Sequence, residues 1–256
     1  MGVRRLQLPI FFTLTLMPFA TAQSQPQQPS MSVRDGGLRG RMESIFIPPK
    51  AGAPFSFVLA TEWSRPLENG GTYTLTNERR IMRDSSGRIY QERWLLVPKG
   101  GKVKSQMDVF QITDPEQHVW LNCTPATKVC ELLPYRLTVQ TEFRPPIGKS
   151  GPLADGSGFR REEDLGVNNT QGEETHGYRE TTTINAGVMG NDRPIVATRE
   201  FWYAARLGFN LISLVDSPQS GKQVFTVKEL STSEPEGNFF KVPGDYRIVD
   251  HMNQQN

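Results

Sequence analysis

Between Phe55 and Trp63, apolar and polar positions alternate along the chain. The side chains of Phe55, Phe57 and Leu59 are large and apolar, whereas those between them are smaller or more polar. A repeat of two residues places alternate side chains on opposite faces of an extended strand. This stretch therefore predicts a β-strand with one clearly apolar face.

Similar segments follow at the spacing of hairpins. We expect further strands at residues 73–83, 89–97, 107–113, 118–123, 129–135, 159–167, 175–184, 195–203, 209–215 and 224–231, with a short tail strand at 245–250. Clusters of turn-forming residues separate several of them, at 84–87, 114–116, 124–127 and 217–221. About ten strands without a long helix predict an all-β fold, a single antiparallel sheet. Short helices are an alternative at 131–139 and 234–241.

The first 22 residues have the three parts of a secretory signal peptide. Arg4 and Arg5 supply a positive start, residues 6–19 are uncharged and mostly apolar, and a small-x-small motif ends at Ala22. We expect cleavage between Ala22 and Gln23. The apolar stretch is short for a transmembrane helix, so we predict no membrane anchor in the mature chain.

Composition divides the rest of the chain. Residues 23–30 (QSQPQQPS) are polar and of low complexity, and we expect a flexible leader over 23–54. A single β domain is predicted over 55–250, followed by a tail at 251–256. The stretch 144–158 is rich in proline and glycine, which predicts an irregular loop.

Charge makes nucleic acid an improbable partner. The chain has 29 basic and 27 acidic residues, and removal of Arg4 and Arg5 leaves the two signs equal. A nucleic-acid-binding protein usually has a basic excess or a basic stripe. We therefore expect an exported protein, periplasmic or secreted, that does not bind nucleic acid.

Several stretches resemble a family of uncharacterised exported proteins of soil bacteria. They are residues 181–195 (TTTINAGVMGNDRPI), 199–203 (REFWY), 43–49 (ESIFIPP), 83–93 (RDSSGRIYQER) and 240–250 (FKVPGDYRIVD). Asn185 departs from the family pattern, which has proline there. More distantly, the strand pattern, the length and the expected compartment are similar to LolA-like periplasmic lipoprotein carriers. That resemblance implies a strongly curved antiparallel sheet, an open or half barrel around a hydrophobic cavity.

Cys123 and Cys130 are the only cysteines. Paired cysteines of exported proteins usually form disulfides. A turn centred on Ala126 and Thr127 would place Cys123 opposite Cys130 and Leu121 opposite Leu132, on the apolar face of a hairpin. We therefore predict an intramolecular disulfide across this hairpin.

No constellation of catalytic residues stands out. The histidines, His118, His176 and His251, are scattered, and the sequence lacks a G-x-S-x-G motif and a phosphate-binding glycine loop. We therefore expect no metal, no cofactor and no enzymatic activity.

The most distinctive loop is Gly187–Pro194 (GVMGNDRP). Asn191, Asp192 and Arg193 could form a polar recognition site. The favoured interpretation is a structured connection, since glycines permit left-handed turns and Asp192 can cap the backbone.

Large aromatic residues are spread over many strands. Trp63, Trp94, Phe110, Trp120 and Trp202 could line a cavity for a lipid or an acyl chain, or fill an ordinary core. The first interpretation predicts a protein that binds a lipid, a lipoprotein acyl chain or another hydrophobic partner in the cell envelope. The alternative is a non-catalytic structural or protein-interaction module of the envelope, and an enzyme of unrecognised type ranks third.

Overall fold

The alternation that starts at Phe55 forms strand β1 (Phe55–Pro66), in which every second side chain is buried as far as Trp63. A computed structural model describes residues 45–135 and 149–252, all within the second of two units into which the chain divides, Gly40–Asn256. We call the side of the sheet to which Phe55, Phe57 and Leu59 point the Phe55 face, and the other side the Val58 face.

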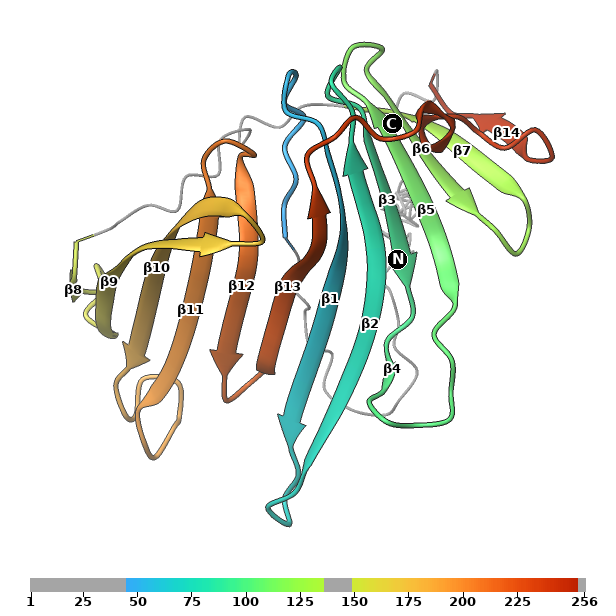
Figure 1. Cartoon of the computed structure of the whole chain (residues 1–256). Helices are drawn as coiled ribbons and strands as arrows, with labels where there is room; N and C mark the ends of the chain where they lie inside the picture. The colour runs from blue at the N-terminus through green and yellow to red at the C-terminus, as the bar shows by residue number, and fades with distance from the viewer. Residues whose placement is uncertain (1–44, 136–148, 253–256) are drawn as a thin grey trace, which may run out of the picture. The chain divides into compact units, whose positions relative to one another are not determined.

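The described residues are almost entirely β-structure (Figure 1). The only helical element among them is a short 3-10 helix, η1 (Gly237–Phe240). The remaining strands are β2 (Thr72–Arg83), β3 (Ile89–Trp94), β4 (Val97–Pro98), β5 (Met107–Asp114), β6 (Val119–Thr124), β7 (Val129–Pro134), β8 (Gly151–Pro152), β9 (Gly158–Thr170), β10 (Glu173–Ile184), β11 (Ile195–Ala204), β12 (Phe209–Ser217), β13 (Gly221–Ser231) and β14 (Arg247–Asp250).

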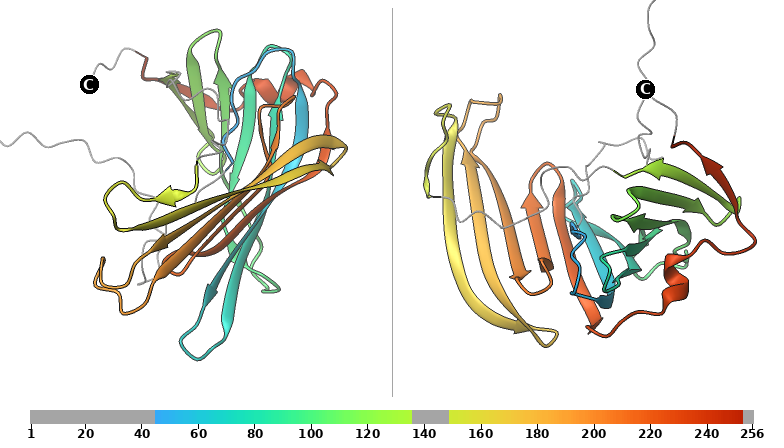
Figure 2. Two further views of the ribbon diagram at one scale, coloured as in Figure 1. Left: turned by 90° about the vertical axis from the view of Figure 1, so that its left-hand side faces the viewer. Right: turned by 90° about the horizontal axis from the view of Figure 1, so that it is seen from above.

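The fourteen strands within residues 45–135 and 149–252 belong to one sheet, in the order β14-β7-β6-β5-β3-β2-β1-β13-β12-β11-β10-β9-β8, with β4 paired to β2. Two meanders meet where β1 pairs with β13. Every pairing is antiparallel except that of β14 with β7. The sheet is curved (Figure 2), and its end strands do not pair, so it is open rather than a closed barrel. The predicted fold class, a single curved antiparallel sheet, is confirmed.

The first core lies on the Phe55 face of the central strands. Phe55, Phe57 and Phe209 pack with ring centres 4.8 to 5.4 Å apart. Ile45 and Ile47, from the segment that precedes β1, are buried in the same core. The predicted flexible leader is therefore wrong for residues 45–54, because this segment supplies apolar side chains that cover the sheet. Residues 23–44 lie outside the described residues, as does the predicted signal peptide.

The second core lies on the Val58 face of β2, β3, β5, β6 and β7. Tyr90 and Phe110 pack there beside the disulfide, and Phe239, Phe240 and Tyr246 cover them. The C-terminal segment runs from β13 through η1 to β14 beside β7 (Figure 2). This segment therefore ties the last strand of one meander to the end of the other.

The predicted strands are found, with boundaries shifted by a few residues. The helix considered at 234–241 corresponds to η1, whereas residues 131–134 belong to β7 and the alternative helix there is wrong. The predicted loop 144–158 is only partly within the described residues, and it contains the short strand β8.

Candidate binding groove at one end of the sheet

A groove of about 430 Å³ lies where β1, β13, β12 and β11 run side by side. Strand pairing lines up its floor: Ser64 lies opposite Lys222, Lys222 opposite Asp216, and Asp216 opposite Thr198. Directly opposed residues of antiparallel strands point to the same face. The register therefore gathers a row of polar side chains from four strands on the Val58 face.

The groove is polar along its floor and apolar at one side. Lys222 contributes a positive charge, Asp216 contributes one carboxylate, and hydroxyl groups come from Ser64, Thr72, Thr198 and Ser217. Val196, at the start of β11, is 47% exposed beside them. Such a lining matches an amphipathic molecule, because the cation and the hydroxyls can bind a polar head while Val196 contacts an apolar part.

A strip of three side chains extends this side of the groove: the apolar Val196 and Phe159, with Thr183 between them. Val196 lies opposite Thr183 of β10, and Thr183 lies opposite Phe159 of β9. Phe159 is also 47% exposed. The strip therefore continues from the groove across two further strands on the same face.

The guanidinium of Arg65 is held by the indole ring of Trp63. Its guanidinium carbon lies 4.8 Å from the centre of the Trp63 ring, and the Trp63 indole Nε1 donates a hydrogen bond to the Ser220 carbonyl at 2.6 Å. The indole thus links β1 to the β12–β13 turn that forms one wall. Stacking of a guanidinium on an indole is a favourable cation–π contact, and it holds the Arg65 charge on the Phe55 face, opposite to the groove floor.

A separate polar cluster lies on the Phe55 face. Burial, with a smaller effect from the Arg93 charge, lowers the pKa of Arg79 to about 9. Burial also lowers the pKa of Arg93, whose Nε donates to Gln111 Oε1 at 3.3 Å. Asn77 Oδ1 is buried without a hydrogen-bond partner. These residues come from β2, β3 and β5, so no local motif indicated them in the sequence.

The disulfide prediction is confirmed. Cys123 and Cys130 are bonded, with Cα atoms 4.0 Å apart, and they lie directly opposite each other in the β6–β7 hairpin. Leu121 pairs with Leu132, as the predicted turn required. Both sulfurs face the second core, where the two cysteines are fully buried.

The five candidate aromatic residues do not meet in one place. Their strand positions put Trp63 and Trp120 on the Phe55 face and Trp94, Phe110 and Trp202 on the Val58 face. Phe110 belongs to the second core. The Trp202 ring lies over Gly177, where an added Cβ would come within 2.8 Å of it. These five residues therefore lie on both faces of the sheet and do not line one common cavity.

The remaining sequence candidates also lie apart. Among the histidines, His176 Nε2 lies 2.6 Å from Asp164 Oδ1, whereas the backbone groups of His118 and His251 bond the β7 region. No group of three or more potential metal-binding side chains occurs within residues 45–135 and 149–252.

The Gly187–Pro194 loop is held by hydrogen bonds of the Asn191 side chain to the backbone of the loop and its flanks. The Asn191 side chain accepts from the Met189 N–H and donates to the carbonyls of Asn185 and Arg193. Asp192 and Arg193 point to solvent. The loop is therefore a structured connection.

No protein-family model matches the sequence, and neither does any curated protein. Among solved structures, MucB is 13% identical with a TM-score of 0.34, over 78% of this chain and 61% of the MucB chain. The Mycobacterium tuberculosis lipoprotein LppX is 12% identical with a TM-score of 0.24, over 72% of this chain and 90% of LppX. A putative outer membrane lipoprotein-sorting protein domain from Vibrio parahaemolyticus is 11% identical with a TM-score of 0.21, over 73% of this chain and 88% of that domain.

Proposed function

We propose that this chain is a non-catalytic binding protein of the cell envelope and that its groove holds an amphipathic lipid. The observation that carries the proposal is that the polar groove continues into a strip on the same face whose outer members, Val196 and Phe159, are apolar and exposed. Lys222 binds the polar head, and the acyl chain lies along Val196 and Phe159. The signal-peptide pattern supports an envelope location, since it predicts export.

The site differs from the enclosed cavity that the LolA-like resemblance implied. Within each of the two cores the aromatic side chains pack together, with ring centres 4.8 to 5.9 Å apart. A lipid therefore binds on the surface of the sheet, where only part of its acyl chain is buried. Because partial burial yields less hydrophobic free energy than full burial, we expect micromolar rather than nanomolar affinity.

Binding of a fluorescently labelled lysophosphatidylglycerol tests the proposal. The full chain is expressed with its leader, the exported product is purified, and the probe is used below its micelle-forming concentration. We expect saturable binding that Lys222→Gln weakens about fivefold, because the variant loses one favourable charge contact of about 1 kcal/mol. Val196→Ser and Phe159→Ser should each weaken binding about threefold, because less apolar surface is buried.

Lys228→Gln is the matched control. Lys228 is on the same strand and face as Lys222, but its Nζ pairs with Glu78 at 2.9 Å away from the groove. This variant should bind the probe like the parent. Equal effects of Lys222→Gln and Lys228→Gln, or no saturable binding, would contradict the proposal.

The alternative is a protein-interaction module of the envelope, and the filled cores favour it. Native mass spectrometry of protein purified gently from its own host separates the two functions. A co-purifying lipid supports the lipid-binding function, whereas a lipid-free protein with a bound protein partner supports the alternative.

A further inference from the structure

The connections at the groove end of the sheet expose large apolar side chains. In an antiparallel meander alternate turns lie at the same end, so the β1–β2, β3–β5, β10–β11 and β12–β13 connections share this end (Figure 1). The apolar rim, as we call it, consists of Leu67, Leu95, Val103, Val188 and Met189, which are 44%, 51%, 63%, 49% and 63% exposed. Single exposed apolar side chains are common on protein surfaces, so the rim indicates a partner only together with the charges beside it.

Basic side chains accompany the rim. Val103 lies between the exposed Lys102 and Lys104 in the connection that leads to β5. Arg193, in the loop that carries Val188 and Met189, has a side chain that is 89% exposed, and its Nε lies 4.0 Å from the exposed Asp192 carboxylate. Cations next to apolar side chains match the interface of a lipid bilayer, where phosphate groups lie above the acyl chains.

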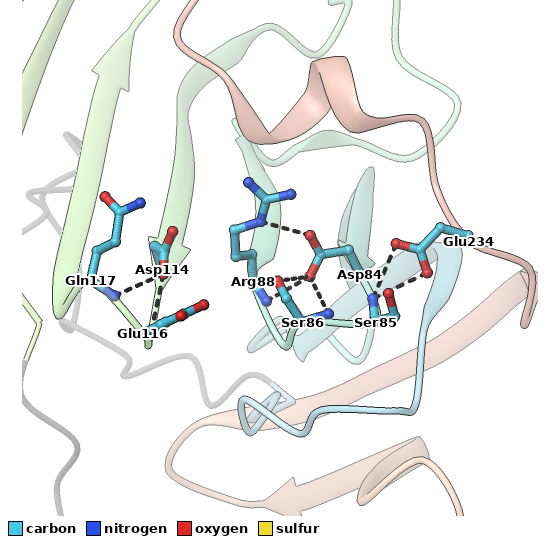
Figure 3. Close-up of polar contacts among 8 residues, drawn as sticks. All are labelled: Asp84, Ser85, Ser86, Arg88, Asp114, Glu116, Gln117 and Glu234. Carbon is cyan, nitrogen blue, oxygen red and sulfur yellow. Dashed lines mark hydrogen bonds and ion pairs between the residues drawn. The ribbon is translucent and has the colours of Figure 1, made fainter.

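The opposite end of the sheet has different chemistry (Figure 3). Asp84 accepts hydrogen bonds from Ser86 and Arg88. Asp114 accepts from the N–H groups of Glu116 and Gln117, and Glu234 accepts from that of Ser85. These carboxylates hold the turns of this end together, and Asp84 is ion-paired with Arg88. At the rim, by contrast, Lys102 and Lys104 are exposed and would attract an anionic surface.

We propose that the apolar rim docks on the surface of a bilayer that contains anionic lipids. Leu67, Val103 and the Val188–Met189 tip enter the interface, while Lys102, Lys104 and Arg193 contact lipid phosphates. The apolar side chains are spread over separate turns instead of forming one continuous patch. A fluid bilayer accommodates such scattered points, whereas a stable protein interface needs a large and closely packed surface.

This surface adjoins the proposed lipid groove, but docking does not depend on a lipid in the groove. The groove lies between the β1–β2 turn and the start of β11, at the same end of the sheet. Docking of the rim would bring the groove to the membrane surface. A lipid could then pass between the groove and the bilayer without crossing water.

Co-sedimentation with vesicles tests the docking proposal. The exported product of the full chain is mixed with phosphatidylcholine vesicles prepared with or without phosphatidylglycerol. We expect binding to the anionic vesicles only, weakened by added salt because exposed charges are screened. Neutralising Lys102 and Lys104 together, as Lys102→Gln/Lys104→Gln, should weaken binding by about 25-fold, since each basic residue near an anionic surface contributes about fivefold.

A second pair of variants separates the rim from apolar exposure in general. Val188→Ser/Met189→Ser should weaken vesicle binding about tenfold, because the tip no longer enters the acyl region. Val167→Ser is the matched control: Val167 is 66% exposed on β9 near the opposite end of the sheet. This control should bind vesicles like the parent.

Three results would overturn the docking proposal. They are vesicle binding that the rim variants leave unchanged, an equal loss in Val167→Ser, and no vesicle binding at all. A dimer that Val188→Ser/Met189→Ser abolishes, without vesicle binding, would assign the rim to a second copy and would also overturn it. Lysolipid binding by the same variants keeps the two proposals apart. Rim variants should bind the lysolipid like the parent, whereas Lys222→Gln should bind it more weakly and still dock on vesicles.

Discussion

The Arg83 guanidinium carbon lies 4.8 Å from the centre of the Phe55 ring, and both side chains are completely buried. Arg83 also donates hydrogen bonds to the carbonyls of Pro48, Ala53 and Leu207 at 2.8 to 2.9 Å. Burial lowers its pKa to about 10. One buried cation thus fastens the segment before β1 and the β11–β12 turn to the first core.

Replacing Arg83 by alanine should destabilise the fold by about 3 kcal/mol. Three buried carbonyls lose their donor and the side chain leaves a cavity, and these losses outweigh relief of the buried charge. Arg80→Ala is the control, since Arg80 is exposed on the opposite face of the same strand. Urea unfolding measures both variants. Similar unfolding free energies for the two would show that Arg83 does not fasten these segments.

Removing the disulfide should weaken the fold without abolishing it. The bridge closes a short loop, with a sequence separation of 7, so Cys123→Ser/Cys130→Ser should cost about 2–3 kcal/mol. A melting curve should show a lower Tm and a cooperative transition, because each core retains its other apolar side chains. Loss of the cooperative transition would mean that the fold depends on this bond.

Gly158→Ala should destabilise the start of β9. A Cβ at this position would lie 1.9 Å from the Thr183 carbonyl oxygen, which belongs to the backbone of the neighbouring strand. The two strands must separate, at a cost of about 2 kcal/mol. Gly151→Ala, with nothing within 4 Å of the added Cβ, should change stability by less than about 0.5 kcal/mol. Denaturation midpoints of the two variants check the difference.

Acid should weaken the contact between β10 and β11. Burial raises the pKa of Glu200, but hydrogen bonds from Trp202 and Arg179 lower it more, so its pKa lies below the ordinary 4.5. The ionised carboxylate therefore stabilises the fold above that value, and its contribution disappears as the pH falls through the lowered pKa.

The Tm of Glu200→Gln should accordingly lie below that of the parent at neutral pH and approach it once the pH has fallen through the lowered pKa of Glu200. The expected difference at neutral pH is below about 1 kcal/mol, because the ion pair is partly exposed. Glu68→Gln, an exposed carboxylate in the β1–β2 turn, is the comparison variant. A Tm difference independent of pH would exclude ionisation of Glu200 as the cause.

Local features of the sequence were sufficient for the strands and for the disulfide. Alternating side chains predicted β1 because one face of that strand is buried as far as Trp63. The disulfide was predictable because Cys123 and Cys130 flank one short turn, and hairpin geometry alone places them opposite each other. The same local reasoning did not show that residues 45–54 belong to the core, since their few apolar side chains have no strand period.

The sequence by itself therefore determined the secondary structure, the class of the sheet and the disulfide, all of which depend on neighbours in the chain. Tertiary structure alone decided which strands lie side by side. The pairing of β1 with β13 brings Ser64 to Lys222, and the next two pairings add Asp216 and Thr198. These residues are distant in the chain and share no motif, because their proximity follows from strand order and register, which the burial of both cores selects.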